Sequence, residues 1–267
     1  MAVAEPFEYE PALYGQHRYG IGKNAGIFVL KSAWFNHLHR PKFAYLAGLL
    51  ARYLVRVLIA TTEPAEEPSL VRREIRAFRE PFRLLAASLR LHRAPRGSRG
   101  VIVVPGFSTS DTIMVPLRSY LRGRGHTVWG WELGVNRGEV DLNLPRVVAQ
   151  VERRVAENNG APITMVGWSF GGVFAREVAR ARPELVEQLV TLASPVRNYR
   201  RSAQNTDVTP IETPITAFYS KRDGVVAWQG AIDKINPNVD MIEVASSHVG
   251  ITLDSTVWLN TAELLAT

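Results

Sequence analysis

From residue 100 to residue 267, short apolar runs rich in β-branched residues alternate with longer stretches of helical periodicity, and no other feature narrows the choice of fold as strongly. Parallel strands joined by helical crossovers are covered on both faces and therefore read as continuous apolar runs. The sequence predicts an α/β fold with a doubly wound, mainly parallel sheet of about six strands and with Ser255 as N-cap of the last helix. The expected strands lie at 101–104, 127–131, 163–167, 189–192, 215–219 and 241–244, and the expected helices include 144–158, 173–181 and 255–265.

The charged residues are unevenly distributed, and this divides the chain into two parts. Residues 1–99 contain 16 basic and 8 acidic side chains, whereas residues 100–267 contain 16 basic and 17 acidic ones. We therefore expect a basic, apolar, helical N-terminal extension (1–99) followed by the α/β domain (100–267). The excess positive charge fits either a solvated helix face or a contact with anionic lipid head groups. It does not indicate nucleic-acid binding, because the sequence contains no recognition helix and no RNA-binding aromatic motif.

Two helical stretches are expected within the N-terminal extension. The first, 43–60, is apolar except for Arg52 and Arg56, which share one helix face. Each arginine would cost about 2.5–3.5 kcal/mol at the centre of a bilayer, so this stretch is not expected to span a membrane. The second, 70–91, carries six arginines among apolar residues, and Pro81 must kink or divide it.

The composition excludes several classes of protein. With 46% hydrophobic and 21% charged residues, the chain is too apolar to be disordered. It contains no cysteine, which excludes disulfides, thiolate-bound metals and a cysteine nucleophile. The first residues lack the basic and apolar regions of a signal peptide, so we expect a cytoplasmic protein.

The motif Gly-Trp-Ser-Phe-Gly at residues 167–171 is the strongest chemical signal in the sequence. It follows an apolar strand and precedes a helix, which is the context of a nucleophile elbow. The tight turn requires Gly167 and Gly171 beside the serine, and it raises the Ser169 hydroxyl above the sheet. We therefore predict that Ser169 is a catalytic nucleophile.

A serine nucleophile needs a base, and the base needs a carboxylate that orients it. Of the six histidines, only His248 follows Ser169 in the chain, and it lies just after the last expected strand. Among the later aspartates, only Asp223 directly follows an apolar strand; its alternative role is that of a plain turn residue before Gly224. The expected triad is Ser169, Asp223 and His248.

An ester transition state also needs two backbone donors for its oxyanion. The N–H of Phe170, the residue after the nucleophile, is one candidate. The turn after the first expected strand, Pro105-Gly106-Phe107-Ser108, supplies the other, and we choose the N–H of Phe107 because Gly106 allows a close approach. The alternative is that Pro105-Gly106 is merely a turn.

These motifs resemble those of α/β-hydrolases, and among them most closely those of bacterial lipases and esterases, over residues 100–267. The resemblance rests on three runs, at residues 103–107, 167–172 and 246–250. It implies chemistry through an acyl-enzyme, without a metal or an organic cofactor. Two features depart from the family pattern: Pro105 stands where many lipases have histidine, and only residues 196–214 occupy the place of a sizeable helical cap.

From these residues we expect a carboxylic ester hydrolase whose substrate is a small-molecule or lipid-like ester, with Trp168 and Trp228 near the acyl chain. Two alternatives stay open, namely an acyltransferase that uses the same triad and a catalytically silent binding protein. Residues 31–93 are expected to form a lid, to contact a lipid surface peripherally, to complete the outer layer of the sheet, or to form a homo-oligomer interface.

Overall fold

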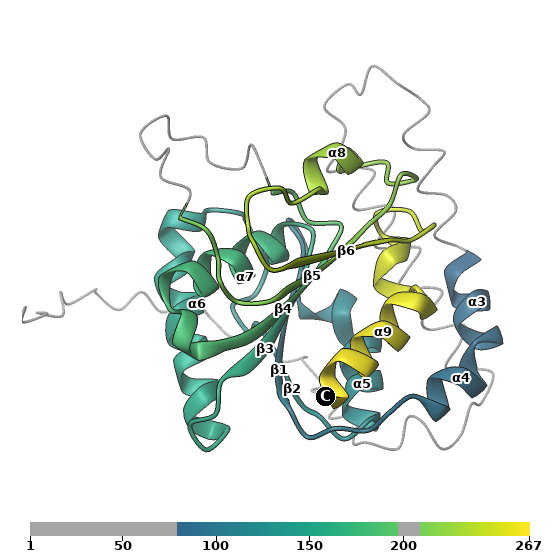
Figure 1. Ribbon diagram of the computed structural model, residues 1–267, viewed down its shortest axis with the longest axis horizontal. Coiled ribbons are helices and arrows are strands. Elements are labelled where there is room, and N and C mark those ends of the chain that lie inside the picture. Colours follow the sequence, from purple (N-terminus) through teal and green to yellow (C-terminus); the bar gives the residue numbers. More distant parts are fainter. Residues whose placement is uncertain (1–78, 197–208) are drawn as a thin grey trace, which may run out of the picture.

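The computed structural model describes residues 79–196 and 209–267, and its centre is a six-stranded sheet (Figure 1). All neighbouring strands are parallel, and their order is β2-β1-β3-β4-β5-β6. The predicted doubly wound α/β fold is thereby confirmed. The strands are β1 (Gly100–Val104), β2 (Thr127–Gly130), β3 (Ile163–Trp168), β4 (Val186–Leu192), β5 (Ile215–Tyr219) and β6 (Val239–Glu243).

Helices cover both faces of the sheet. Figure 1 shows α6 and α7 on one face and α5 and α9 on the other, with α3 and α4 outside α9. The helices are α3 (Glu80–Ala86), α4 (Ser88–Arg93), α5 (Val115–Gly123), α6 (Val140–Glu157), α7 (Phe170–Ala181), α8 (Trp228–Ala231) and α9 (Ser255–Ala266). Short 3₁₀ turns are η2 (Asp111–Met114), η3 (Pro183–Leu185) and η4 (Gly250–Leu253).

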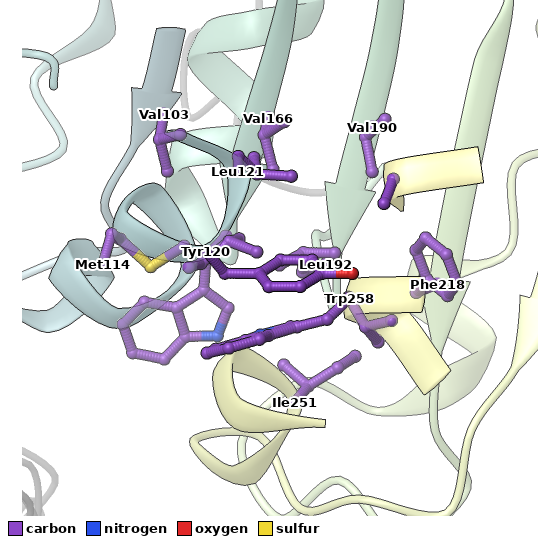
Figure 2. Packing of buried hydrophobic residues seen from close by; sticks show 14 of the residues in the cluster. Val103, Met114, Tyr120, Leu121, Val166, Val190, Leu192, Phe218, Ile251 and Trp258 are labelled. Carbon is purple, nitrogen blue, oxygen red and sulfur yellow. The ribbon is translucent and has the colours of Figure 1, made fainter. Parts of the chain in front are cut away.

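The core between the sheet and the α5–α9 layer is built around a pair of aromatic rings. Tyr120 of α5 and Trp258 of α9 stack with their centroids 5.0 Å apart and their planes 26° apart (Figure 2). Valines on β1, β3 and β4 pack from the sheet side against the same cluster. Burial of each such apolar side chain contributes about 1.5–3 kcal/mol, which fixes this layer firmly on the sheet.

Three helices differ from the sequence-based expectation. The helix expected at 144–158 begins at Val140, so Pro145 lies inside α6 instead of near its start. The N-cap of α9 is Asp254 rather than Ser255, because the Asp254 carboxylate accepts the N–H groups of Thr256 and Val257. Helix α5 was not predicted.

The part of the N-terminal extension that the structure describes packs on the outer side of α9. Helices α3 and α4 contact α9, and α3 also contacts η4. Pro81 lies in the first turn of α3, where proline is well tolerated, and the part of the 70–91 stretch that precedes residue 79 lies outside the described residues. The remainder, including 43–60 and most of 31–93, lies outside the described residues, and the division at residue 99 stays a prediction. Within the described ranges, no helix is long and apolar enough to cross a membrane.

Parallel strands place their carboxyl ends at one edge of the sheet. The segments that follow β1, β3, β5 and β6 therefore emerge at the same edge. These segments carry the turn after Val104, Ser169, Asp223 and His248 respectively. The topology alone thus brings together residues that are up to about 140 positions apart in the sequence.

Candidate active site

Ser169 occupies a sharp turn between β3 and α7. Its backbone has φ 51° and ψ −124°, a conformation that L-residues other than glycine rarely adopt. Two hydrogen bonds hold this turn, since the Ser169 N–H donates to Leu192 O at 2.8 Å and the Gly172 N–H donates to Ser169 O at 3.0 Å. The sharp strand-to-helix turn expected at Ser169 is present, and the role of Ser169 as a nucleophile stays a prediction.

The glycines beside Ser169 are required by close backbone contacts. A Cβ on Gly167 would lie 2.5 Å from Gly172 Cα, and a Cβ on Gly171 would meet the carbonyl oxygens of Val104 and Pro105. Because these neighbours are backbone atoms, they cannot rotate away as a side chain could. The start of α7 therefore packs directly against the end of β1 and the turn that follows it.

The structure brings Ser169, His248 and Asp223 into one hydrogen-bonded chain. His248 Nε2 lies 2.9 Å from Ser169 Oγ, and His248 Nδ1 lies 2.7 Å from Asp223 Oδ2. Both His248 and Asp223 are buried, which strengthens their interaction by excluding water. Asp223 Oδ1 accepts the N–H groups of Val225 and Val226 at 2.7 and 2.8 Å, so its other oxygen is left facing the imidazole.

Trp168 holds the loop that carries His248 by a hydrogen bond from its side chain. The Trp168 side chain is buried, at 2% exposure, and its Nε1–H donates to His248 O at 3.0 Å. In the same loop, the Ser246 hydroxyl donates to the Asp254 carboxylate. Trp168 was expected beside the substrate; its burial and this hydrogen bond instead make it a support for the loop that carries His248.

Trp228, the second aromatic residue expected near the substrate, lies at the start of α8. Its ring packs against Tyr219, with centroids 6.5 Å apart, and Lys221 Nζ lies 5.7 Å from the ring centre. These contacts attach α8 to the end of β5. The described contacts of Trp228 are thus with Tyr219 of β5 and with Lys221, the second residue after that strand, rather than with the triad.

The turn after β1 lies against the nucleophile. A Cβ on Gly106 would be 3.2 Å from Ser169 Cβ and 2.9 Å from the Trp168 ring, so only glycine fits there. The Phe107 N–H donates to no acceptor within the described residues, whereas the Ser108 N–H is bonded to Asn136 O. Of these two neighbouring N–H groups, that of Phe107 is therefore the one left available beside Ser169, and its role as an oxyanion donor stays a prediction.

Asn136 is a buried residue of this region that the sequence analysis missed. It lies in the loop between β2 and α6 and bonds the turn after β1 with both its backbone and its side chain. The loop contains Gly134 and Gly138, both with positive φ. An asparagine between two such glycines was the available signal, although asparagine is common in ordinary turns as well.

The described residues offer no metal centre. Within 79–196 and 209–267, no group of three or more His, Asp and Glu side chains is arranged to hold a metal ion. The Asp223 carboxylate already bonds two backbone N–H groups and His248.

Neither a protein-family model nor a curated protein matches the sequence. The fold, in contrast, matches solved structures. Aspergillus fumigatus lipase B superposes with a TM-score of 0.52 at 14% identity, over 64% of this chain and 53% of the lipase. A structure from the metagenome-derived lipolytic enzymes LipS and LipT superposes with a TM-score of 0.50 at 18% identity, over 64% of this chain and 95% of that one.

The sheet order, the turn at Ser169 and these superpositions define the α/β-hydrolase fold. Within that fold, the chain resembles esterases and lipases, as its sequence motifs predicted.

Proposed function

We propose that the protein is a serine hydrolase that cleaves carboxylic esters with lipid-like acyl chains. The observation that carries this proposal is the hydrogen-bonded chain from Ser169 Oγ through His248 to Asp223. A serine hydroxyl becomes nucleophilic when an adjacent base can accept its proton, and this arrangement provides that base.

In the first half of the reaction, Ser169 Oγ attacks the carbonyl carbon of the ester and its proton moves to His248 Nε2. The carbonyl oxygen becomes an oxyanion, which accepts hydrogen bonds from the N–H groups of Phe107 and Phe170. Each such donor typically contributes about 2.7–4 kcal/mol of transition-state stabilisation. The tetrahedral intermediate then expels the alcohol, which takes the proton from Nε2, and leaves an acyl group on Ser169.

In the second half, water attacks the acyl carbonyl and gives a proton to His248 Nε2. The acid leaves as the proton returns to Ser169 Oγ, which restores the free enzyme. Throughout, the Nδ1–H of His248 donates to Asp223 Oδ2, which keeps the imidazole in the tautomer that presents a lone pair at Nε2. The Asp223 carboxylate stabilises the imidazolium.

An apolar surface beside Ser169 supports a lipid-like acyl group. Phe107 is 57% exposed although it is a large apolar side chain. Its ring meets that of Phe170 edge-on, with centroids 6.3 Å apart, and both residues flank the proposed oxyanion site. An acyl chain that covered this pair would gain about 25 cal/mol for each Å² of apolar surface removed from water.

Hydrolysis of p-nitrophenyl esters from acetate to palmitate tests the proposal. We expect wild-type activity to favour the longer chains, and Ser169→Ala to lower kcat by roughly 10⁶-fold, as loss of a catalytic serine typically does. Ser119→Ala on α5 serves as the control and should hydrolyse the esters as wild type does. A fluorophosphonate should label wild type on Ser169. Equal activity of wild type and Ser169→Ala, or inert wild type without a label, would refute the proposal.

A further inference from the structure

Asn136 bonds the turn after β1 at three points. Its side-chain Nδ2–H donates to Pro105 O at 2.8 Å. Its backbone N–H donates to Thr109 O at 2.8 Å, and its carbonyl accepts the Ser108 N–H at 2.6 Å. The side-chain oxygen of Asn136 accepts the Gly138 N–H at 3.0 Å, which fixes the orientation of the amide. One residue thus holds both ends of the segment 105–109.

A second set of hydrogen bonds, made by Thr109, acts inside the same turn. Gly106 O accepts both the hydroxyl of Thr109 at 2.7 Å and the Thr109 N–H at 3.2 Å. The peptide group between Gly106 and Phe107 is planar and trans, so its N–H points opposite to its carbonyl. Because the carbonyl is held on the Thr109 side, the direction of the Phe107 N–H is fixed as well.

The hydrogen bonds of Asn136 and of Thr109 act on consecutive peptide groups. Asn136 holds the carbonyl of Pro105, and Thr109 holds the carbonyl of Gly106. If the Pro105 carbonyl were released, rotation about the Gly106 backbone would become easier, since glycine has the widest range of φ and ψ. That rotation would turn the Phe107 N–H away from the nucleophile, against which this turn lies.

We propose that the Asn136 side chain is a positioning residue that holds the Phe107 N–H in place as an oxyanion donor. The inference rests on the proposed hydrolase function. Asn136 has 0% exposure, so it does not touch substrate and acts only through the turn. Catalysis of this kind depends on donors that are oriented before charge develops, which is why a buried amide can influence the rate.

The test begins with Asn136→Ala and measures kcat and KM separately. Loss of one oxyanion donor typically costs about 10²–10³ in kcat, so a donor that is misoriented part of the time should cost roughly 10- to 100-fold, with KM within about twofold. Asn158→Ala is the matched control. Asn158 also donates from Nδ2 to a backbone carbonyl, Ala161 O at 3.0 Å, but at the opposite edge of the sheet. Asn158→Ala should therefore leave kcat unchanged.

Asn136→Asp adds a readout that does not depend on the alanine variant folding. When protonated, the introduced carboxyl can donate to Pro105 O as the amide does; when ionised, it repels that oxygen. Burial raises the pKa of a carboxyl group, so the introduced carboxyl should lose its proton closer to neutral pH than an exposed one would. We expect the ratio of kcat for Asn136→Asp to kcat for wild type to fall as pH rises from 5.5 to 9.

The outcomes separate this inference from the proposed function. If Ser169→Ala abolishes hydrolysis while Asn136→Ala keeps wild-type kcat, the enzyme is a serine hydrolase and the role of Asn136 is refuted. A kcat ratio for Asn136→Asp that is constant with pH would refute it as well. If wild type neither hydrolyses esters nor reacts with a fluorophosphonate, the hydrolase proposal fails and this inference fails with it.

Discussion

The two carboxylate oxygens of Asp223 have separate partners, and this separation decides what a substitution there changes. Oδ1 bonds the N–H groups of Val225 and Val226, which shapes the loop after β5. Oδ2 faces His248 Nδ1 at 2.7 Å, which orients the imidazole. A variant that keeps the first contact and loses the second would isolate the effect on the base.

Asp223→Asn is such a variant. The amide oxygen can still accept from the loop, but the amide NH₂ cannot accept the Nδ1–H of His248, so the imidazole adopts the tautomer with its proton on Nε2. We expect kcat to fall by about 10⁴-fold while the melting temperature changes little. Asp240→Asn, on the exposed side of β6, is the control. A variant with kcat within tenfold of wild type would contradict the role of Asp223.

At the scale of single residues, positions in the chain indicated which three side chains the fold brings into one hydrogen-bonded chain, and their catalytic roles stay a prediction. Ser169, Asp223 and His248 each follow a strand, and parallel topology brings the carboxyl ends of strands together. Trp168 was misjudged, because the sequence shows an aromatic residue beside the nucleophile but not whether it faces the pocket or the core. Asn136 was missed since its function arises from contacts with a turn 31 positions away.

At the scale of elements, the junction between α7 and the end of β1 sets the position of the nucleophile. Gly171→Ala would place a Cβ against the carbonyl oxygens of Val104 and Pro105, of which the second lies 2.7 Å away. Such overpacking costs about 1–3 kcal/mol. We expect Gly171→Ala to lower the free energy of unfolding by this amount and to lower kcat, because α7 must move away from the turn after β1.

Gly230→Ala provides the matched control for that prediction. Gly230 lies in α8, and a Cβ there would meet nothing within 4 Å. The free energy of unfolding of Gly230→Ala should stay within about 0.5 kcal/mol of that of wild type, as for most surface substitutions. Urea denaturation of the two variants together with wild type measures both effects. Equal stability of Gly171→Ala and wild type would show that the two elements are packed less tightly than the structure indicates.

The centres of strands were easier to predict than the ends of helices. A buried strand is marked by its apolar run, and all six expected runs contain strand residues. The start of α6 was misplaced by four residues because Pro145 suggests a first turn. Asp254 rather than Ser255 caps α9, and both residues are good N-caps, so their order in sequence does not decide between them.

At the scale of the whole molecule, the described part of the N-terminal extension adds a further layer outside α9. An amphipathic, arginine-bearing helix presents the same sequence pattern whether it packs on a protein, covers a site or contacts lipid. The sequence therefore left these roles open. Helices α3 and α4 contact α9, so residues 80–93 pack on the protein itself. Most of the stretch 31–93, for which a lid was one expectation, lies outside the described residues.

Stability of the whole domain should depend on pH through His126, a buried residue at the start of β2. Neither ring nitrogen of His126 has a hydrogen-bond partner among the described residues. Burial lowers the pKa of His126, and the nearby charge of Arg99 lowers it further. The unfolded chain, with an ordinary histidine pKa of about 6.5, therefore binds this proton more readily than the folded protein does.

The sign of the effect follows from that difference. Above about pH 6.5 the histidine is neutral in both states and stability is complete; as pH falls from there toward the lowered pKa of the folded state, protonation favours unfolding. His126→Gln removes this proton, so its free energy of unfolding should fall less than that of wild type between pH 7.5 and pH 5. His92→Gln, on the exposed side of α4, should keep the wild-type slope. Urea denaturation across this range measures how steeply the free energy of unfolding of each protein changes with pH. Parallel curves for wild type and His126→Gln would mean that the buried ring accepts its proton without loss of stability.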